Sequence, residues 1–451
     1  MMKGIRLASF GIRGFIGESL HPRNLMDFAC AFGTFNEGGR ILLGRDTRYS
    51  SDMLHESVVA GLLSCGCEII DFDICPAPIL QYSVQAYGAA GAISISGGHN
   101  GPGWNAMTLI GNDGAYLNPQ GGQIVLDYYH AANFHQAAWD GMGSIVEDQH
   151  YVQPYFEALC AFLEVDAIRE QSFTVLIDPV GGAGCPFIEP FAEALGFKLI
   201  SVNGEPSGYL ARDPEPRPRT ARHLCGIIGH VDGDVGFVLN SDMSRLSLVS
   251  ETGEPASEES TFPLIADHVL RKQAGVLVTN TCTTRILDAV AALRGSRAVK
   301  TPVGQAHVLA RLIDEDGVIG GEGNGSVAVP AFSRSFDGFL MMGLVLEAMA
   351  KRRKTLSELL AELPRYHVVK TSCPCSSSEA YHALDRLRIE LSEDPEIHSV
   401  ELVDGVRVDW LESWVHARAS RTEQSIRIIS EATTMAMAKE KNEFVRRILD
   451  L

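Results

Sequence analysis

The sequence predicts three similar α/β domains followed by a fourth domain of α+β type. Short apolar runs alternate with periodic helical stretches in the segments 1–150, 151–254 and 255–365, as in βαβ units around parallel or mixed sheets. The same order recurs in these segments, which indicates one kind of unit used three times. The segment 366–451 differs, because a helical stretch there precedes several hairpin-like strands.

In the first segment, five short apolar runs predict strands and two stretches of helical periodicity predict helices. The expected strands are 6–10, 41–43, 68–74, 92–95 and 107–110, and the expected helices are 24–37 and 52–63. A glycine-rich turn is expected at 11–14, directly after the first strand.

The later segments are interpreted in the same way. The second has expected strands at 173–178, 198–202 and 234–239 and a helix at 187–195. The third has strands at 275–279 and 298–301 and helices at 285–293 and 305–314. The fourth has a helix at 376–391, a hairpin at 400–408 and strands at 414–417 and 426–430.

The composition of the chain excludes several classes of protein. Its 451 residues are 45% hydrophobic and 21% charged, which is typical of a globular chain with several cores. The net charge of −18 argues against nucleic acid and anionic membranes as partners. No run reaches about 18 apolar residues, and the N-terminus lacks the apolar stretch of a signal peptide. We therefore expect a soluble protein without nucleic-acid or membrane partners.

The cysteines indicate the compartment. Ten cysteines are too few for a disulfide scaffold in a chain of this length, and no pair of CxxC motifs indicates zinc. Two CxC pairs occur, Cys65 with Cys67 and Cys373 with Cys375. We interpret all ten as reduced residues of cores and strands, which predicts a cytoplasmic protein.

A glycine-rich loop at 97–103 lies between two expected strands and carries His99 and Asn100. Glycine adopts positive φ at little cost, so such a loop lets the backbone approach a ligand closely. Two interpretations stay open at this point. The loop is either a chemical centre or an ordinary connection with a polar tip.

Two arginine loops fit an anion. Arg13 lies in a glycine-bounded turn, and Arg45 and Arg48 end an expected strand. The planar guanidinium group can bind phosphate through two parallel hydrogen bonds. The alternative is an arginine paired with a neighbouring carboxylate.

Two further loops carry oxygen-bearing side chains. Asn240, Asp242 and Ser244 alternate and could face a hard cation, but only one is a carboxylate, so a polar turn is the better interpretation from the residues alone. Glu322 and Asn324 lie on a loop with four glycines and suit hydrogen bonding to sugar hydroxyl groups, with a flexible turn as the alternative.

The last polar loop, 418–423, is expected between two strands of the fourth domain. It offers hydroxyl groups, backbone N–H groups and two guanidinium groups within six residues, which suits a phosphate. A charged hairpin turn is the alternative. Its residues are Arg418, Ala419, Ser420, Arg421, Thr422 and Glu423.

Taken in order, these loops resemble those of the α-D-phosphohexomutase family, which includes phosphomannomutase/phosphoglucomutase and phosphoglucosamine mutase. The resemblance covers nearly the whole chain and is strongest at 44–51, 213–216, 320–325, 337–338 and 418–428. It implies four domains around a central cleft and the transfer of a phosphoryl group between C1 and C6 of a hexose. It also implies a phosphoserine on domain 1, Mg²⁺ on domain 2, sugar recognition by domain 3 and binding of the other phosphate by domain 4.

The resemblance implies roles for particular residues. Arg13, His99 and Arg245 match the family's catalytic centre. The family's sugar loop is matched by Glu322 and Asn324, and its phosphate motif R-P-S-G-T-E is matched by Arg418, Ser420, Thr422 and Glu423. Arg421 is a further candidate for phosphate binding from its residue type.

Two motifs depart from the family pattern. The phosphoserine motif T-A-S-H-N-P reads S-G-G-H-N-G at 96–101, which places Gly98 at the serine position. The metal motif D-G-D-G-D-R reads N-S-D-M-S-R at 240–245, where only Asp242 keeps a carboxylate. Glycine offers no nucleophilic oxygen, and Mg²⁺ prefers several anionic oxygens.

We therefore expect a protein that binds a hexose phosphate and lacks the standard mutase reaction, as a regulator, a carrier or the partner of an active enzyme. No cofactor follows from the sequence, and Mg²⁺ binding is expected to be weak or absent. One alternative is an active phosphotransferase with Ser96 or Ser94 as substitute nucleophile. Another is a different reaction on a phosphosugar, with His99 as acid and base.

Overall fold

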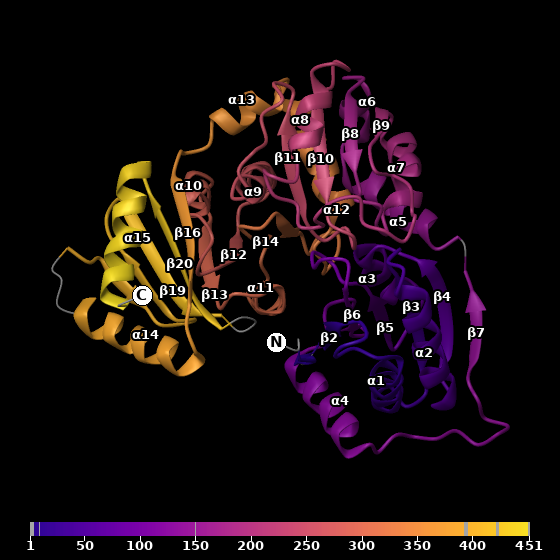
Figure 1. Ribbon diagram of the computed structural model, residues 1–451. Helices are drawn as coiled ribbons and strands as arrows, with labels where there is room; N and C mark the ends of the chain where they lie inside the picture. The colour runs from indigo at the N-terminus through magenta and orange to yellow at the C-terminus, as the bar shows by residue number, and fades with distance from the viewer. Residues whose placement is uncertain (1–3, 9, 149, 392–395, 421–423, 450–451) are drawn as a thin grey trace. The chain divides into compact units, whose positions relative to one another are not determined.

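The computed structural model describes residues 4–8, 10–148, 150–391, 396–420 and 424–449 (Figure 1). The chain forms two compact units, of which the first contains residues 1–268 and 324–360 and the second contains 269–323 and 361–451. Within the described ranges, no helix is both long and apolar enough to cross a membrane. The ten cysteines are all free.

The first unit contains a mixed seven-stranded sheet with the order β1-β2-β6-β5-β3-β4-β7. Its strands are β1 (Arg6–Ala8), β2 (Gly11–Phe15), β3 (Arg40–Arg45), β4 (Glu68–Ile74), β5 (Gly91–Ile95), β6 (Trp104–Ile110) and β7 (Ser144–Glu147). Strands β5, β3, β4 and β7 are parallel, and antiparallel pairs add β6, β2 and β1. The four central residues of β3 are buried, as expected of a parallel strand with both faces covered.

Four helices accompany this sheet. They are α1 (Pro22–Phe35), α2 (Ser51–Ser64), α3 (Ala77–Ala86) and α4 (Pro119–Ala131). Helix α1 begins at Pro22, whose fixed φ suits the first helical position, and Asn24 Oδ1 accepts a hydrogen bond from His21 N at 3.1 Å. Helices α1 and α2 pack together and share one apolar core with the sheet, including Phe28, Phe32 and Leu62.

A second sheet in the first unit has the order β11-β10-β8-β9. Its strands are β8 (Thr174–Asp178), β9 (Lys198–Ser201), β10 (Val235–Leu239) and β11 (Leu246–Ser250), and β11 alone is antiparallel. The remaining elements that begin in this unit are α5 (Val152–Phe162), α6 (Val165–Arg169), η1 (Cys185–Phe187), α7 (Ile188–Leu195), α8 (Arg222–Ile228), α9 (Thr261–Lys272), β15 (Ser326–Ala328), α12 (Gly338–Arg352) and α13 (Leu356–Ala361).

Helix α12 is buried on all sides from Gly338 to Ala350. Its sequence is apolar all round, which is the pattern of a helix inside a core. The buried carboxylate of Glu347 lies 2.8 Å from His268 Nε2, so the polar group in this helix has a partner.

The second unit contains parallel strands β13 (Arg297–Thr301), β12 (Val276–Asn280) and β14 (Ile319–Glu322) with helices α10 (Ile286–Leu293) and α11 (Gln305–Asp314). It also contains an antiparallel five-stranded sheet with the order β16-β20-β19-β18-β17. The bounds of that part are β16 (His367–Pro374), α14 (Ser377–Leu391), β17 (Ser399–Glu401), β18 (Val406–Asp409), β19 (Ser413–Ala419), β20 (Ser425–Ala432) and α15 (Met435–Leu449). Three parallel or mixed α/β sheets followed by an antiparallel α+β sheet confirm the predicted fold class.

One local prediction was wrong. The expected glycine-rich turn at 11–14 is strand β2, which pairs with β1 on one side and β6 on the other. A Cβ at Gly11 would lie 2.3 Å from Met107 O, so glycine here permits close approach of two strands. Arg13 consequently lies in a strand, opposite Ala106.

The buried His416 predicts a stability that depends on pH. Burial lowers the pKa of His416 to about 4, with Arg418 and Arg407 adding to the effect, while its usual value is about 6.5. The folded state therefore favours the neutral ring, and this contribution is complete above pH 6.5 and lost as the pH falls toward 4. Between pH 7 and pH 5 we expect a loss of about 2 kcal/mol in the free energy of unfolding of the second unit.

The measurement compares wild type with His416→Gln in denaturant at both pH values, using the fluorescence of Trp414 in the same strand. The difference in the free energy of unfolding between wild type and His416→Gln should be about 2 kcal/mol smaller at pH 5 than at pH 7. A difference that stays constant with pH would contradict the expectation.

Candidate functional site

Two loops of this chain correspond to the phosphoserine and metal motifs described above. The first, residues 96–101, follows β5, and the second, residues 240–245, follows β10. The structure brings them together within the first unit. Gly98 has a φ of +56°, and a Cβ added there would lie 2.8 Å from Asp242 Oδ2. Both loops leave the carboxyl ends of strands, where α/β sheets place their ligand sites. The missing side chain of Gly98 thus points at the carboxylate that remains in the metal loop.

Arg48 holds the loop after β5 in place through hydrogen bonds to its backbone carbonyl groups. Its Nη2 donates to Gly98 O at 3.1 Å and to Asn100 O at 2.7 Å, and its Nη1 donates to Gly101 O at 2.9 Å. Its Nε donates to the buried Asp46 Oδ2 at 2.9 Å. The alternative of carboxylate pairing therefore describes Arg48, which is 2% exposed and whose three guanidinium nitrogens all donate to protein oxygens.

Arg45 is also paired, with Asp52 at 2.9 Å and with Asp73 at 2.7 Å. Both contacts join Nη2 of Arg45 to carboxylates of neighbouring elements, Asp52 on helix α2 and Asp73 on strand β4. Anion binding by Arg45 is therefore not supported by its surroundings.

Ser96 belongs to the same network. Its Oγ donates to Asp46 Oδ2 at 2.7 Å and accepts from Gly98 N at 3.0 Å. Ser241 Oγ lies 3.1 Å from the same Asp46 oxygen and 2.8 Å from Gly98 O. Sequence reasoning did not identify Asp46 or Ser241 as site residues, and the motif at 44–51 was the signal that contained the first of them.

His99 lies among arginines. Burial lowers the pKa of His99 well below its usual value, and the positive charges of Arg245, Arg13, Arg217 and Arg48 lower it further, in that order. The imidazole ring is therefore neutral near pH 7. A neutral ring surrounded by guanidinium groups is suited to a bound anion, because the cations attract it and the ring adds a hydrogen bond.

The charge of this arginine cluster is only partly compensated. Arg245 Nη1 donates to Glu215 Oε1 at 3.0 Å, and Arg217 Nη2 donates to Glu215 Oε2 at 2.5 Å. Burial lowers the pKa of Arg13, and Arg6 and Arg245 add to this shift. Arg245 is 9% exposed, and its Nε has no hydrogen-bond partner among the described residues. An anion would supply that partner.

The loop after β10 hydrogen-bonds to itself. Asp242 Oδ1 accepts from Asn240 Nδ2 at 2.7 Å, from Ser244 Oγ at 2.6 Å and from Ser244 N at 3.0 Å. Asn240 Oδ1 accepts from Ser244 N and from Arg245 N. The described part of the chain contains no group of three or more His, Cys, Asp or Glu side chains arranged to hold a metal ion.

These residues do not fit Mg²⁺. The ion prefers several anionic oxygens in octahedral geometry, whereas this loop offers one carboxylate whose Oδ1 already accepts three hydrogen bonds. We expect a dissociation constant for Mg²⁺ weaker than about 1 mM. Calorimetry with wild type and with the double variant Asn240→Asp, Ser244→Asp checks this, because the variant restores three carboxylates. A wild-type site tighter than about 0.1 mM that disappears in Asp242→Ala would contradict it.

Glu322 ends strand β14 in the second unit and is 5% exposed. Its Oε1 accepts from Asn280 Nδ2 at 2.8 Å and from Gly304 N at 2.9 Å, so the carboxylate is held in place by two donors. In the first unit, Asn324 Oδ1 accepts from Ser326 N at 3.1 Å. The structure therefore shows an ordered Glu322 rather than a flexible turn at that position.

The predicted phosphate loop joins β19 and β20 of the five-stranded sheet. Arg418 lies near the end of β19, and its buried Nε makes no hydrogen bond to any described residue. Ser420 N donates to Ser425 O at 2.8 Å across the hairpin. Arg421 and Thr422 lie outside the described residues.

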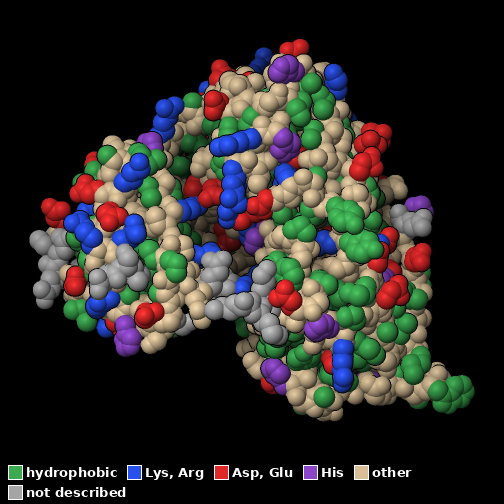
Figure 2. All heavy atoms as spheres, viewed as in Figure 1, with side chains coloured by type: hydrophobic (Ala, Val, Ile, Leu, Met, Phe, Trp, Pro, Cys, Tyr) green, Lys and Arg blue, Asp and Glu red, His purple; other side chains and the backbone are tan. Residues whose placement is uncertain are grey.

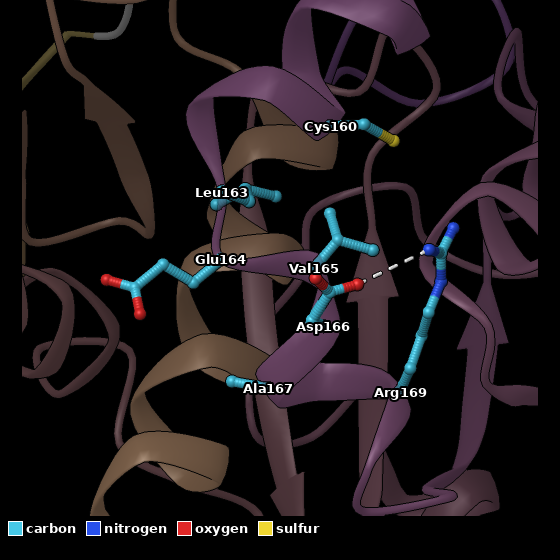
Figure 3. Close-up of a pocket in the computed structure, with 7 residues that line it drawn as sticks. All are labelled: Cys160, Leu163, Glu164, Val165, Asp166, Ala167 and Arg169. Atoms are coloured by element: carbon cyan, nitrogen blue, oxygen red, sulfur yellow. Dashed lines mark ion pairs between the residues drawn. The ribbon is translucent and has the colours of Figure 1, made fainter.

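A hollow of about 430 Å³ lies elsewhere on the first unit, where α5 meets α6 (Figure 3). Two of its acidic side chains are already paired, Asp166 with Arg169 at 3.7 Å and Glu164 with Lys351 at 2.5 Å. None of the predicted site residues lines it. We assign it no function.

Models of three domains of one family match this chain. Phosphoglucomutase/phosphomannomutase alpha/beta/alpha domain I matches residues 7–136, domain II matches 153–253, and domain III matches 257–366. The three matches follow each other in the same order as the three α/β sheets described above.

Individual proteins of this family are also similar to the chain over most or all of its length. A phosphoglucomutase/phosphomannomutase of Thermococcus kodakarensis is 33% identical and is covered over 99% of both chains. The structure of a phosphoglucomutase/phosphomannomutase family protein from Burkholderia thailandensis has a TM-score of 0.86 at 22% identity, covering 99% of this chain and 98% of that one. An N-acetylphosphoglucosamine mutase of Aspergillus fumigatus, in complex with GlcNAc-6P and magnesium, has a TM-score of 0.58 at 15% identity, covering 91% and 82%. The chain therefore belongs to the phosphoglucomutase/phosphomannomutase family of α-D-phosphohexomutases.

Proposed function

We propose that this protein binds a hexose phosphate and does not carry out the phosphoserine-dependent mutase reaction. The observation that carries the proposal is Gly98 at the serine position, with its Cβ direction 2.8 Å from Asp242 Oδ2. A phosphoenzyme requires an oxygen at this position to attack phosphorus, and glycine has none. In this proposal the protein acts as a regulator, a carrier or a partner of an active mutase.

The departure of the metal loop from the family motif supports the same proposal as Gly98. Asn240 and Ser244 donate hydrogen bonds to Asp242, where metal ligands would instead present lone pairs. The framework around these residues is ordered, because Arg48, paired with Asp46, donates to the backbone carbonyl groups of Gly98 and Asn100. The losses thus fall on phosphoryl transfer, while the anion-binding groups are kept.

Binding is proposed for each retained loop. Arg13 and Arg245 attract a phosphate, and the neutral His99 gives it a hydrogen bond. Glu322 and Asn324 accept hydrogen bonds from sugar hydroxyl groups, and Arg418 binds a phosphate together with Ser420, Arg421 and Thr422. Relatives named as mutases and a fold neighbour crystallised with GlcNAc-6P support a phosphosugar as the ligand class.

The proposal includes the division into four domains at 1–150, 151–254, 255–365 and 366–451. The family matches support it, because each falls within one of the first three segments to within one residue.

One observation favours a second candidate, an active phosphotransferase with Ser96 as nucleophile. Ser96 Oγ donates to a carboxylate, Asp46 Oδ2, at 2.7 Å, which is the arrangement of a hydroxyl group with a general base. Against it, Asp46 is ion-paired with Arg48 and also accepts hydrogen bonds from Ser51 and Ser241, so its carboxylate is already engaged by the framework of the loop. Loss of any measured turnover in Ser96→Ala would identify this candidate.

The experiment measures products and binding on one preparation. Glucose, mannose and glucosamine phosphates are supplied with Mg²⁺ and a hexose bisphosphate, all products are analysed, and the same sugars are titrated by calorimetry. Binding without product supports the proposal, and mutase product at ordinary rates overturns it. A product other than the isomeric phosphate would instead support His99 as acid and base in a different reaction.

A further inference from the structure

Strand β7 forms one edge of the seven-stranded sheet and is exposed along its whole length. Among the described residues it pairs with β4 alone, since it is the last strand in the sheet order. All four of its residues are exposed, including Ile145 at 43% and Val146 at 55%. The loop before it exposes Trp139 at 87% and Met142 at 55%. Figure 1 shows β7 at the outer border of the unit, and Figure 2 shows apolar side chains at the tip of the loop that leads into it.

The backbone of this edge has unused hydrogen-bonding groups. Ser144 N donates to Cys67 O and Asp148 N donates to Asp71 O, so these residues face β4. Alternate residues of a strand present their N–H and C=O groups to opposite sides. Ile145 and Glu147 therefore direct theirs away from the sheet, where no strand of the described ranges pairs with them.

Exposed edges of this kind are usually protected, because they pair readily with another strand. Common protections are a very short strand, charged side chains, proline and bulges. Strand β7 (SIVE) is short and carries one charge, Glu147, but contains no lysine or proline. Four large apolar residues are exposed at this edge or in the loop before it: Trp139, Met142, Ile145 and Val146. The side chains of Ile145 and Val146 lie on opposite faces of the sheet, because they are consecutive residues of one strand.

We propose that β7 pairs with β7 of a second copy of this chain, antiparallel, and joins two seven-stranded sheets into one. The occupant is a second copy because one register satisfies every outward backbone group of both strands. In that register Ile145 exchanges both hydrogen bonds with the partner's Glu147, and Val146 lies opposite the partner's Val146 on the two-fold axis.

Two other registers are worse. A pairing centred on Ile145 would require the N–H of Gly143, which already donates to Leu63 O. A pairing centred on Glu147 would place two carboxylates opposite each other, which is destabilising. The register centred on Val146 instead places Glu147 opposite an isoleucine.

A standard interface buries about 800 Å² on each partner. Two short paired strands do not supply this area alone, so in the proposed dimer the exposed loop before β7, with Trp139 and Met142, would contribute to the contact. A hydrophobic centre with a polar border is the usual composition of such an interface.

The test measures the mass of the full-length protein in solution by light scattering at micromolar concentration. We expect twice the chain mass of 48.9 kDa for wild type and the single chain mass for Val146→Lys, which places two ammonium groups together on the axis. Ile124→Lys is the matched control, since Ile124 is 46% exposed on α4 and should leave the dimer intact. A monomeric wild type, or a dimer that persists in Val146→Lys, overturns the proposal.

Cysteine cross-linking tests the register independently. Opposite residues of a non-hydrogen-bonded antiparallel pair have Cα atoms about 4.5 Å apart, within the range of a disulfide. Val146→Cys should therefore form a covalent dimer under mild oxidation, whereas Ile145→Cys and wild type should not. Equal cross-linking of both variants, or of neither, would exclude this register.

Discussion

The purified protein is expected to show no detectable interconversion of the 1- and 6-phosphates of glucose, mannose or glucosamine, even with Mg²⁺ and a bisphosphate activator. Ordinary enzymes turn over at about 1–1000 per second. Removing a covalent nucleophile typically lowers kcat by about 10⁶-fold. Gly98 removes the nucleophilic oxygen, and Asp242 has its Oδ1 engaged by Asn240 and Ser244.

The assay is best paired with phosphoprotein analysis after incubation with labelled hexose bisphosphate. We expect no label on the wild-type protein. Turnover near the ordinary range would contradict the expectation. Slow turnover with label on Ser96, both lost in Ser96→Ala, would support the second candidate function.

Variants that restore the missing groups separate the loss of the nucleophile at Gly98 from the loss of carboxylates in the metal loop. Gly98→Ser alone should remain inactive, because the loop after β10 still presents one carboxylate, Asp242, where the family motif presents three for Mg²⁺. The triple variant that adds Asn240→Asp and Ser244→Asp should regain measurable turnover, since it restores both the nucleophile and three carboxylates. Full activity of Gly98→Ser by itself would show that the metal loop is not impaired.

Much of the fold could be predicted from the sequence because its strands are short, buried and apolar. Strands β3, β8 and β12 were found in this way. Strand β2 was missed because its glycines resemble a turn, and only its two neighbouring strands reveal its state. Helix α12 was not predicted, because a helix that is apolar all round has no amphipathic period to detect.

The candidate site could be indicated by residue type, whereas its contacts could not. The family resemblance indicated His99, Arg13 and Arg245, and in the structure the positive charges of Arg245 and Arg13 contribute to lowering the pKa of His99. By contrast, Arg48 donates to Ser241 across 193 positions of sequence, and no local pattern encodes such a contact. The same holds for the Asn240 amide, whose donation to Asp242 turns a loop that resembles a metal site into a closed hydrogen-bonded turn.

Sugar-phosphate binding is expected to survive, and Arg418→Ala should weaken it by about tenfold to a hundredfold. A hydrogen bond to a charged group contributes about 1.5–3 kcal/mol, and the buried Nε of Arg418 has no partner among the described residues, so a phosphate would be its first. Arg388→Ala is the matched control, because that arginine is exposed on α14 and forms an ion pair with Asp385 of its own helix.

The sugar should be distinguished from its phosphate by a second variant. Glu322→Gln keeps an oxygen for Asn280 and Gly304 but removes the negative charge that strengthens hydrogen bonds from sugar hydroxyl groups. It should therefore weaken a hexose phosphate and leave inorganic phosphate nearly unchanged, as measured by calorimetric titration of wild type and the variants. If no hexose phosphate binds below millimolar concentration, or if Arg418→Ala binds as tightly as wild type, the retained loops are remnants of ancestry. The function would then lie on another surface, and the β7 edge, which needs no sugar ligand, would be the first place to test.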